Sequence, residues 1–150
     1  MDEQIQQDEK NITLKDKPII YNKIDVSLYG ELLSLSKNKA EVFFVPTETM
    51  IYDDESIHPG FVFSAAAYTA MCAINKKNSI IISSETKFLA PIEYGHELVF
   101  KANAIQGEAK KCEVKVEGFL LDIKIFDAIF YIAIFDKKLF RLKLKEDKEA

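Results

Sequence analysis

The order of apolar and polar residues divides the middle of the chain into a hairpin, a helix and four long strands. Residues 31–36 (ELLSLS) and 40–45 (AEVFFV) flank the turn-forming pair Lys37 and Asn38, which predicts a β-hairpin. Residues 60–75 carry apolar side chains on every face without an interrupting proline, which predicts a helix surrounded by other elements. At about 1.5 Å per residue it would span roughly 24 Å, so we expect it to cross the centre of the domain.

The second half of the chain is rich in β-branched and aromatic residues, which favour strands. Four stretches carry this pattern: SIIISSETKFL, ELVFKANAIQ, CEVKVEGFLL and a last run that ends in DAIFYIAIF. Gly95 and Gly107 separate the first three, and we place the last turn within residues 121–126. Residues 50–57, rich in Asp and Glu, are predicted to form an exposed loop. Together these elements predict an α+β fold in which a curved antiparallel sheet wraps around a central helix.

Length and composition favour a single domain. A chain of 150 residues with 48% hydrophobic content can bury about two-thirds of its unfolded surface in one core. We assign residues 17–142 to this domain, residues 1–16 to a flexible arm and residues 143–150 to a polar tail. The start has neither a basic nor an apolar signal region, and residues 57–74 fall short of the roughly 20 apolar residues of a membrane span. We therefore expect a cytoplasmic protein with no membrane partner.

Charge and cysteine content argue against several classes of partner and site. A net charge of -4 and a single arginine, Arg141, disfavour binding to nucleic acid. Cys72 and Cys112 fit neither a metal site nor a disulfide framework, so we interpret both as small buried apolar residues. The acidic residues 53–55 lack a second cluster of ligands, so we expect a solvated loop there and no metal site.

Two motifs, HPGFVF at residues 58–63 and FLAPIEYGHEL at residues 88–98, carry a family resemblance. The first resembles the loop-to-helix entry, and the second a strand signature, of the hot-dog superfamily of acyl-CoA thioesterases and hydroxyacyl dehydratases. The likeness covers residues 29–135 and implies the hot-dog fold. The stretch SSETKFLAPIEYGHELVFKANAI is also similar to the effector-binding domain of the fatty-acid synthesis regulators that sense malonyl-CoA. The Lys-, Ile- and Phe-rich composition further resembles the flagella-co-regulated, virulence-associated hot-dog proteins of Campylobacter.

The resemblance implies a mechanism with two parts. In hot-dog enzymes, backbone N–H groups at the start of the helix polarise the thioester carbonyl, and a carboxylate acts as nucleophile or general base. Gly60, Phe61 and Val62 would supply the N–H groups here. The glycine would also let a ligand approach the main chain closely.

The catalytic residues of the family are missing at the matching positions. The dehydratase glutamate falls on Ala65, and the thioesterase aspartate falls on Ala67. The serine that those thioesterases often place before the strand proline falls on Ala90. Because alanine can neither attack a carbonyl nor transfer a proton, we expect no efficient catalysis by this helix. Asp53, where many thioesterases have an asparagine, and His58 are the candidate catalytic residues that remain.

The ligand that the resemblance implies is an uncharged acyl chain. The arginine with which the regulators neutralise malonate is matched by His58, and their helix asparagine by Ala67, which weakens selection for a charged acyl group. Small and aromatic residues instead suit a hydrocarbon of medium or greater length. The expected ligand-binding residues are His58, Gly60, Phe61, Val62, Phe63, Ala65, Ala67, Met71, Phe88 and Ala90.

The function predicted from these residues is binding without efficient turnover. We expect a homodimer that binds fatty acyl-CoA or a related thioester, needs no other cofactor, and acts as a sensor, carrier or regulator in fatty-acid metabolism. The run IFDAIFYIAIF supports a dimer, because its weak alternation implies burial at an interface. Two alternatives are a thioesterase that uses Asp53 or His58 and a protein-interaction module on a hot-dog scaffold. His58 is otherwise an ordinary loop residue, and His96 is assigned a structural role in a turn.

Overall fold

The computed structural model describes Pro18, Lys23, residues 25–105 and residues 110–135. Its helices and strands lie in the order in which the sequence pattern changes from short strands to a helix and then to long strands. Their bounds are η1 Val26–Leu28, β1 Glu31–Ser36, β2 Lys39–Phe44, η2 Glu48–Met50, β3 Ile51–Asp53, β4 Ser56–Ile57, α2 Pro59–Ile74, β5 Ser79–Phe88, β6 Leu98–Ala104, β7 Lys111–Leu120 and β8 Ile123–Ile134.

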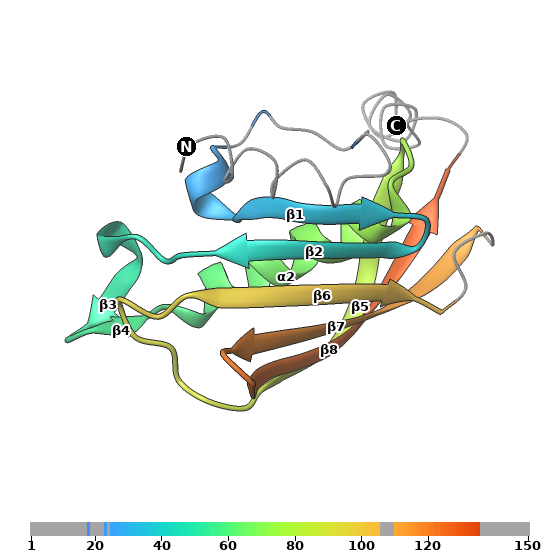
Figure 1. The fold of residues 1–150 in the computed structure, drawn as a ribbon. Coiled ribbons are helices and arrows are strands. Elements are labelled where there is room, and N and C mark those ends of the chain that lie inside the picture. The colour runs from blue at the N-terminus through green and yellow to red at the C-terminus, as the bar shows by residue number, and fades with distance from the viewer. Residues whose placement is uncertain (1–17, 19–22, 24, 106–109, 136–150) are drawn as a thin grey trace, which may run out of the picture.

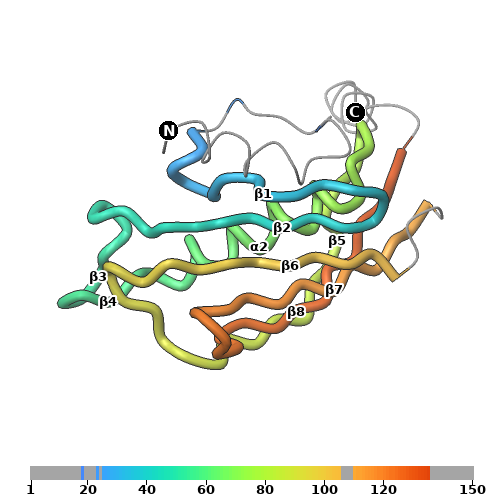
Figure 2. Tube along the Cα trace, in the orientation of Figure 1, coloured from blue at the N-terminus to red at the C-terminus, as the bar shows by residue number. Residues whose placement is uncertain are grey.

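Six of the strands form one sheet that curves around α2 (Figures 1 and 2). The strand order is β1-β2-β6-β7-β8-β5, and every neighbouring pair is antiparallel. β5 lies at the edge beside β8, while β6, which follows it in the chain, pairs with β2. β3 and β4 form a separate two-stranded hairpin. The predicted α+β architecture, a curved antiparallel sheet around a helix, is confirmed.

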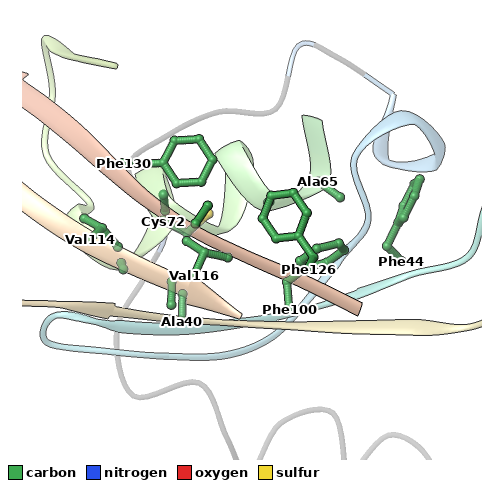
Figure 3. Close-up of a cluster of buried hydrophobic side chains, with 14 of the residues drawn as sticks. Ala40, Phe44, Ala65, Cys72, Phe100, Val114, Val116, Phe126 and Phe130 are labelled. Atoms are coloured by element: carbon green, nitrogen blue, oxygen red, sulfur yellow. The ribbon is translucent and has the colours of Figure 1, made fainter. Parts of the chain in front are cut away.

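The core lies between α2 and the inner face of the sheet. Figure 3 shows Ala65 and Cys72 of the helix among aromatic and branched side chains of the strands. Both residues are fully buried, and such small side chains let the helix backbone approach the sheet closely. Gly118 of β7 makes room for an aromatic ring of the neighbouring strand, because a Cβ atom there would lie 2.7 Å from a ring carbon of Phe100. The strand residues of this cluster include Phe44, Phe100, Val114, Val116, Phe126 and Phe130.

Most predicted element boundaries agree with the structure. The first hairpin turns at the predicted pair, where Asn38 has a φ of 64°. The helix begins at Pro59, one residue before the predicted start, and ends at Ile74, where it is capped by Asn75, whose φ of 49° is left-handed. The last turn lies at residues 121–122, where Leu121 has a φ of 57°.

One prediction, that residues 50–57 form an exposed loop, is wrong for most of the segment. η2 ends at Met50, and β3 and β4 occupy residues 51–53 and 56–57. Met50 is 1% exposed and Ile57 3% exposed, because both side chains enter the core. The exposed part consists of residues 52–55, which are the end of β3 and the acidic turn that follows it.

The prediction that other elements surround the helix on every side is also only partly correct. Gly60 and Ser64 are exposed, and Ala67 and Met71 are half-buried. This spacing places the four residues on one face of α2, which we call the uncovered stripe. Within the described chain, the sheet therefore covers the other faces of the helix and leaves this one accessible.

The predicted arm at residues 1–16 and the predicted tail at residues 143–150 lie outside the described residues. So do residues 17, 19–22, 24, 106–109 and 136–142 of the predicted domain, among them the predicted turn residue Gly107. Among the helices that the structure describes, none combines the length and the apolar character that a membrane crossing requires.

Candidate functional site

A cavity of about 370 Å³ opens beside the first turn of α2. Three segments line it: the β3–β4 hairpin, the start of α2 and the end of β5 with the residues that follow it. Backbone hydrogen bonds join two of these segments, from Ile57 N–H to the Ile92 carbonyl at 2.8 Å and from Tyr94 N–H to the Glu55 carbonyl at 2.7 Å. The lining residues are Tyr52, Ser56, Ile57, Pro59, Val62, Phe88, Leu89, Ala90, Pro91 and Ile92. Because none of them is charged, the cavity suits an uncharged group.

His58 caps the start of α2. Its Nδ1 accepts a hydrogen bond from Gly60 N–H at 2.9 Å, and its backbone carbonyl accepts one from Phe61 N–H at 3.1 Å. Pro59, the first helical residue, has no N–H to offer. The first amides that were predicted to polarise a thioester carbonyl thus already have partners. A ligand oxygen that bonded to Gly60 N–H would have to displace the imidazole.

The imidazole also gives Gly60 a structural reason to be glycine. A Cβ atom at Gly60 would lie 2.9 Å from His58 Nδ1 and 3.1 Å from Cε1. The ring is held edge-on against Tyr52, with 5.5 Å between the ring centroids. Since Tyr52 lines the cavity, the cap and the cavity share one wall.

Three of the ten predicted ligand-binding residues, Val62, Phe88 and Ala90, line the cavity. Val62 is buried and forms part of its inner wall, whereas Phe88 is 50% exposed. The Phe88 ring meets the buried Phe126 ring edge-on, with 5.5 Å between centroids. The two motifs that carry the resemblance are therefore brought together at one site, although they lie 25 or more residues apart in the sequence.

The other helix residues predicted to bind the ligand lie outside the cavity lining. Ala65 is fully buried in the core, and Phe63 packs against Phe130 of β8, with 5.4 Å between ring centroids. Ala67 and Met71 are half-buried and belong to the uncovered stripe. Of the two alanines, Ala65 thus faces the core and Ala67 lies on the uncovered stripe.

Asp53, a candidate catalytic residue, lies on β3 opposite Ser56. It is exposed and is not among the residues that line the cavity. Among the described residues, no group of three or more His, Cys, Asp or Glu side chains is placed to hold a metal ion. Asp53, Asp54 and Glu55 lie between the lining residues Tyr52 and Ser56, and all three side chains are exposed.

Sequence reasoning missed the part of the lining that comes from the β3–β4 hairpin, Tyr52, Ser56 and Ile57. The acidic turn between them suggested a loop and hid two strands of only three and two residues. The signal that could have revealed them is the apolar Ile57 directly before the first motif. Pro91, another lining residue, is part of the second motif but was not among the predicted ligand-binding residues.

The two cysteines are free and buried, as predicted. Burial raises the pKa of the Cys72 thiol to about 11, and the Tyr68 hydroxyl is hydrogen-bonded to this thiol. Burial also raises the pKa of Cys112. Both thiols therefore stay protonated at neutral pH, which makes them poor nucleophiles.

Solved structures with this architecture include two close in sequence. The HP0420 homologue from Helicobacter felis is 39% identical, with a TM-score of 0.75, and the match covers 78% of this chain and 97% of that chain. Cj0977, a sigma28-regulated virulence protein from Campylobacter jejuni, is 34% identical, with a TM-score of 0.79 and coverage of 82% and 88%. The E. coli PaaI protein from the phenylacetic acid degradation operon, at 19% identity, a TM-score of 0.67 and coverage of 72% and 80%, shares the fold.

Curated relatives match over a shorter part of their length. A methylthioribose-1-phosphate isomerase of Aquifex aeolicus is 36% identical over 109 residues, which is 72% of this chain and 24% of the isomerase. The transcription factor FapR of Thermoanaerobacter sp. is 30% identical over 110 residues, 72% of this chain and 55% of the factor. The chain thus spans about half of the factor and about a quarter of the isomerase. No family model matches the chain.

These likenesses confirm three parts of the resemblance inferred from the motifs and the composition. The fold is that of the hot-dog proteins, a transcriptional regulator is a relative, and so is a Campylobacter virulence protein. Family membership follows from two solved structures that share this architecture. They are 39% and 34% identical to this chain, and the matches cover 97% and 88% of their lengths. The chain belongs to the hot-dog protein family that includes the HP0420 homologue of Helicobacter felis and Cj0977 of Campylobacter jejuni.

Proposed function

We propose that this protein binds an acyl thioester, with the acyl chain in the cavity beside α2, and does not turn it over efficiently. The observation that carries the proposal is the cavity itself, about 370 Å³ in volume and lined without a single charged side chain. Pockets of this size that are mostly apolar are typical of small-molecule sites. In this role the protein is a sensor, carrier or regulatory module of fatty-acid metabolism.

The absence of efficient turnover is supported by what stands around the cavity. Ala65 and Ala67 occupy the helix positions where related enzymes have a carboxylate, and neither can act as a base. Asp53 is exposed on β3 and is not among the residues that line the cavity. His58 Nδ1 is engaged by Gly60 N–H, so this nitrogen cannot accept a proton without breaking the helix cap.

The relatives support binding and regulation as the broad role. FapR is a transcription factor, and Cj0977 is described as a sigma28-regulated virulence protein. A hot-dog domain that senses a ligand fits the first, because a regulator needs a binding site and no catalytic residue. A role in virulence is part of the same proposal and rests on Cj0977 alone.

Calorimetric titration with octanoyl-CoA, palmitoyl-CoA and malonyl-CoA, run beside steady-state hydrolysis of the same compounds, tests the proposal. We expect binding of the first two without comparable hydrolysis. The variant Ala90→Phe should weaken this binding by roughly tenfold or more, because a ring there takes up space that the chain needs. The matched control is Asn103→Phe on the exposed outer face of β6, which should leave binding unchanged.

Other outcomes would favour the alternatives. Hydrolysis that is lost in Asp53→Ala or His58→Ala would make the protein a thioesterase. Neither binding nor hydrolysis of any thioester would favour a protein-interaction module. Tighter binding of malonyl-CoA than of the two fatty acyl-CoAs would overturn the assignment of an uncharged acyl chain.

A homodimer completes the proposal. β5 is ten residues long and, among the described strands, pairs with β8 on one side alone. A long edge strand presents unpaired N–H and C=O groups that can pair with another chain. Ile82 on this strand is 52% exposed, and the uncovered stripe of α2 leaves a second surface accessible. We propose that two copies join their sheets through β5.

A further inference from the structure

The cavity beside α2 has a closed inner end and an open mouth. Ile57, Val62 and Ile92 line it and are buried, and all three side chains also belong to the hydrophobic core cluster. Tyr52 and Phe88 line it as well, but their side chains are exposed. A chain that enters between the exposed side chains therefore has to stop at the buried ones.

Backbone hydrogen bonds hold the inner end in place. The Ile57 N–H donates to the Ile92 carbonyl at 2.8 Å, and the next amide, that of His58, donates to the Met50 carbonyl at 2.9 Å. Met50 is itself a buried member of the core cluster. Because side chains in a protein core are close-packed and leave few voids, a ligand finds no room beyond these residues. The volume of the cavity is thus a fixed limit.

This volume converts to a length of chain. A methylene group of a hydrocarbon takes up about as much space as a water molecule in liquid water, which is about 30 Å³. The cavity volume of about 370 Å³ therefore corresponds to about twelve such groups. A shorter chain leaves part of the apolar lining in contact with water, and a longer chain cannot be enclosed completely.

We propose that this cavity measures the length of the acyl chain, encloses about twelve carbons at most, and is limited at its inner end by Val62 and Ile92. The inference rests on the proposed function, because it concerns which acyl chain enters the same cavity. Up to this length, each added methylene group leaves water for the apolar lining. The additional carbons of a longer chain stay at the mouth, where they gain little.

The test is a calorimetric titration with saturated acyl-CoAs of increasing length, from hexanoyl-CoA to palmitoyl-CoA, each kept below its critical micelle concentration. Burial of one methylene group raises an affinity by up to about fourfold. We expect the affinity to rise with each added carbon until about dodecanoyl-CoA and to level off from there. The length at which it levels off is the quantity that the variants should change.

Variants at the inner end should move this length in opposite directions. Val62→Ala removes two methyl groups and should move it by about one carbon toward longer chains, since the space left by a deleted side chain closes only in part. Val62→Ile adds one methyl group and should move it by about one carbon toward shorter chains. Ile92→Val removes less of the core than Val62→Ala, so it costs less stability, and should act in the same direction.

The matched control is Val114→Ala on β7. Val114 is also a buried valine of the core cluster, but it is not among the residues that line the cavity. Its replacement should lower the free energy of unfolding in the same way as Val62→Ala and leave the dependence of affinity on chain length unchanged.

An affinity that keeps rising at the same rate through palmitoyl-CoA would overturn the inference and leave the proposed function standing. The same holds if neither Val62→Ile nor Ile92→Val moves the length at which the affinity levels off, or if Val114→Ala moves it equally. Failure of every acyl-CoA to bind would overturn the proposed function and this inference with it.

Discussion

At the scale of single residues, the pair His58 and Gly60 decides what the start of α2 can do. The sequence motif suggested that Gly60 exists to let a ligand reach the backbone. In the structure its N–H is bonded to His58 Nδ1, and the ring fills the space that a Cβ atom would need. The glycine is thus explained by a contact within the chain, and the motif serves as a helix cap.

The effect of this cap on stability can be measured by urea unfolding. His58→Ala removes the side-chain acceptor and should lower the free energy of unfolding by about 1 kcal/mol, a typical value for a lost N-cap. His58→Asn keeps an acceptor and should cost less than half of this. A loss equal in the two variants would show that the Gly60 bond contributes nothing.

A double-mutant cycle tests whether the ring is what excludes a side chain at position 60. In the His58→Ala background, Gly60→Ala should stabilise by about 0.5 to 1 kcal/mol, because alanine is favoured over glycine in a helix. In the wild type the same change should be neutral or destabilising, since the Cβ atom would push the imidazole off its bond. Additive effects would contradict the proposed contact.

At the scale of elements, the β7–β8 hairpin contains a residue in an unfavourable conformation. Leu121 is the first residue of a two-residue turn, has a φ of 57° and is 88% exposed. Glycine is the residue usually found where the first position of such a turn needs a positive φ. A leucine there is strained and has little contact with the rest of the protein.

Replacement of this leucine should therefore stabilise the protein. Leu121→Gly removes the strain of a left-handed L-residue and should raise the free energy of unfolding by about 1 kcal/mol in urea denaturation. Ile105→Gly is the control, because Ile105 is 60% exposed and is not among the residues of positive φ. Stabilisation of both variants alike would point to a general effect of removing exposed apolar surface.

At the scale of the whole molecule, the edge strand β5 is the element through which we propose that two copies of the chain associate. Its pairing with β8 is interrupted by a bulge between Ile81 and Ser83, so Ile82 has no opposite residue on β8. Beside the bulge the strand continues in register to Phe88, opposite Phe126. The part of β5 from Ser83 onward is therefore regular enough to pair with a second copy along its free edge.

The proposed homodimer can be tested by light scattering coupled to size exclusion. The wild type should have the mass of two chains, and Ile82→Lys should shift it toward the mass of one, because a lysine on an edge strand opposes pairing. Leu121→Lys also places a charge at an exposed apolar residue, but away from β5, and should leave the mass unchanged. A wild-type mass of one chain at micromolar concentration would refute the dimer.

The sequence predicted the type of each long element, because hydrophobic periodicity and turn residues are local signals. Turn residues were also recognised from local signals. His96, for instance, was assigned a structural role in a turn, and its Nδ1 accepts a hydrogen bond from Glu93 N–H at 3.0 Å. The signal failed where elements are short, and it located the last turn only broadly, within residues 121–126, where the turn residue is unusual. β3 and β4 span only three and two residues, and Leu121 gave no indication of a turn.

By itself the sequence determined that a helix is followed by long strands, and its resemblance to the family predicted that alanines stand where related enzymes have carboxylates. These are properties of single positions and their near neighbours. Only the tertiary structure decided that β5 lies beside β8, that the cavity forms from the hairpin, the start of the helix and the end of β5, and that His58 occupies the Gly60 amide. Each of these depends on which surfaces pack together, and that follows from burial and hydrogen bonding summed over the whole chain and not from any local pattern.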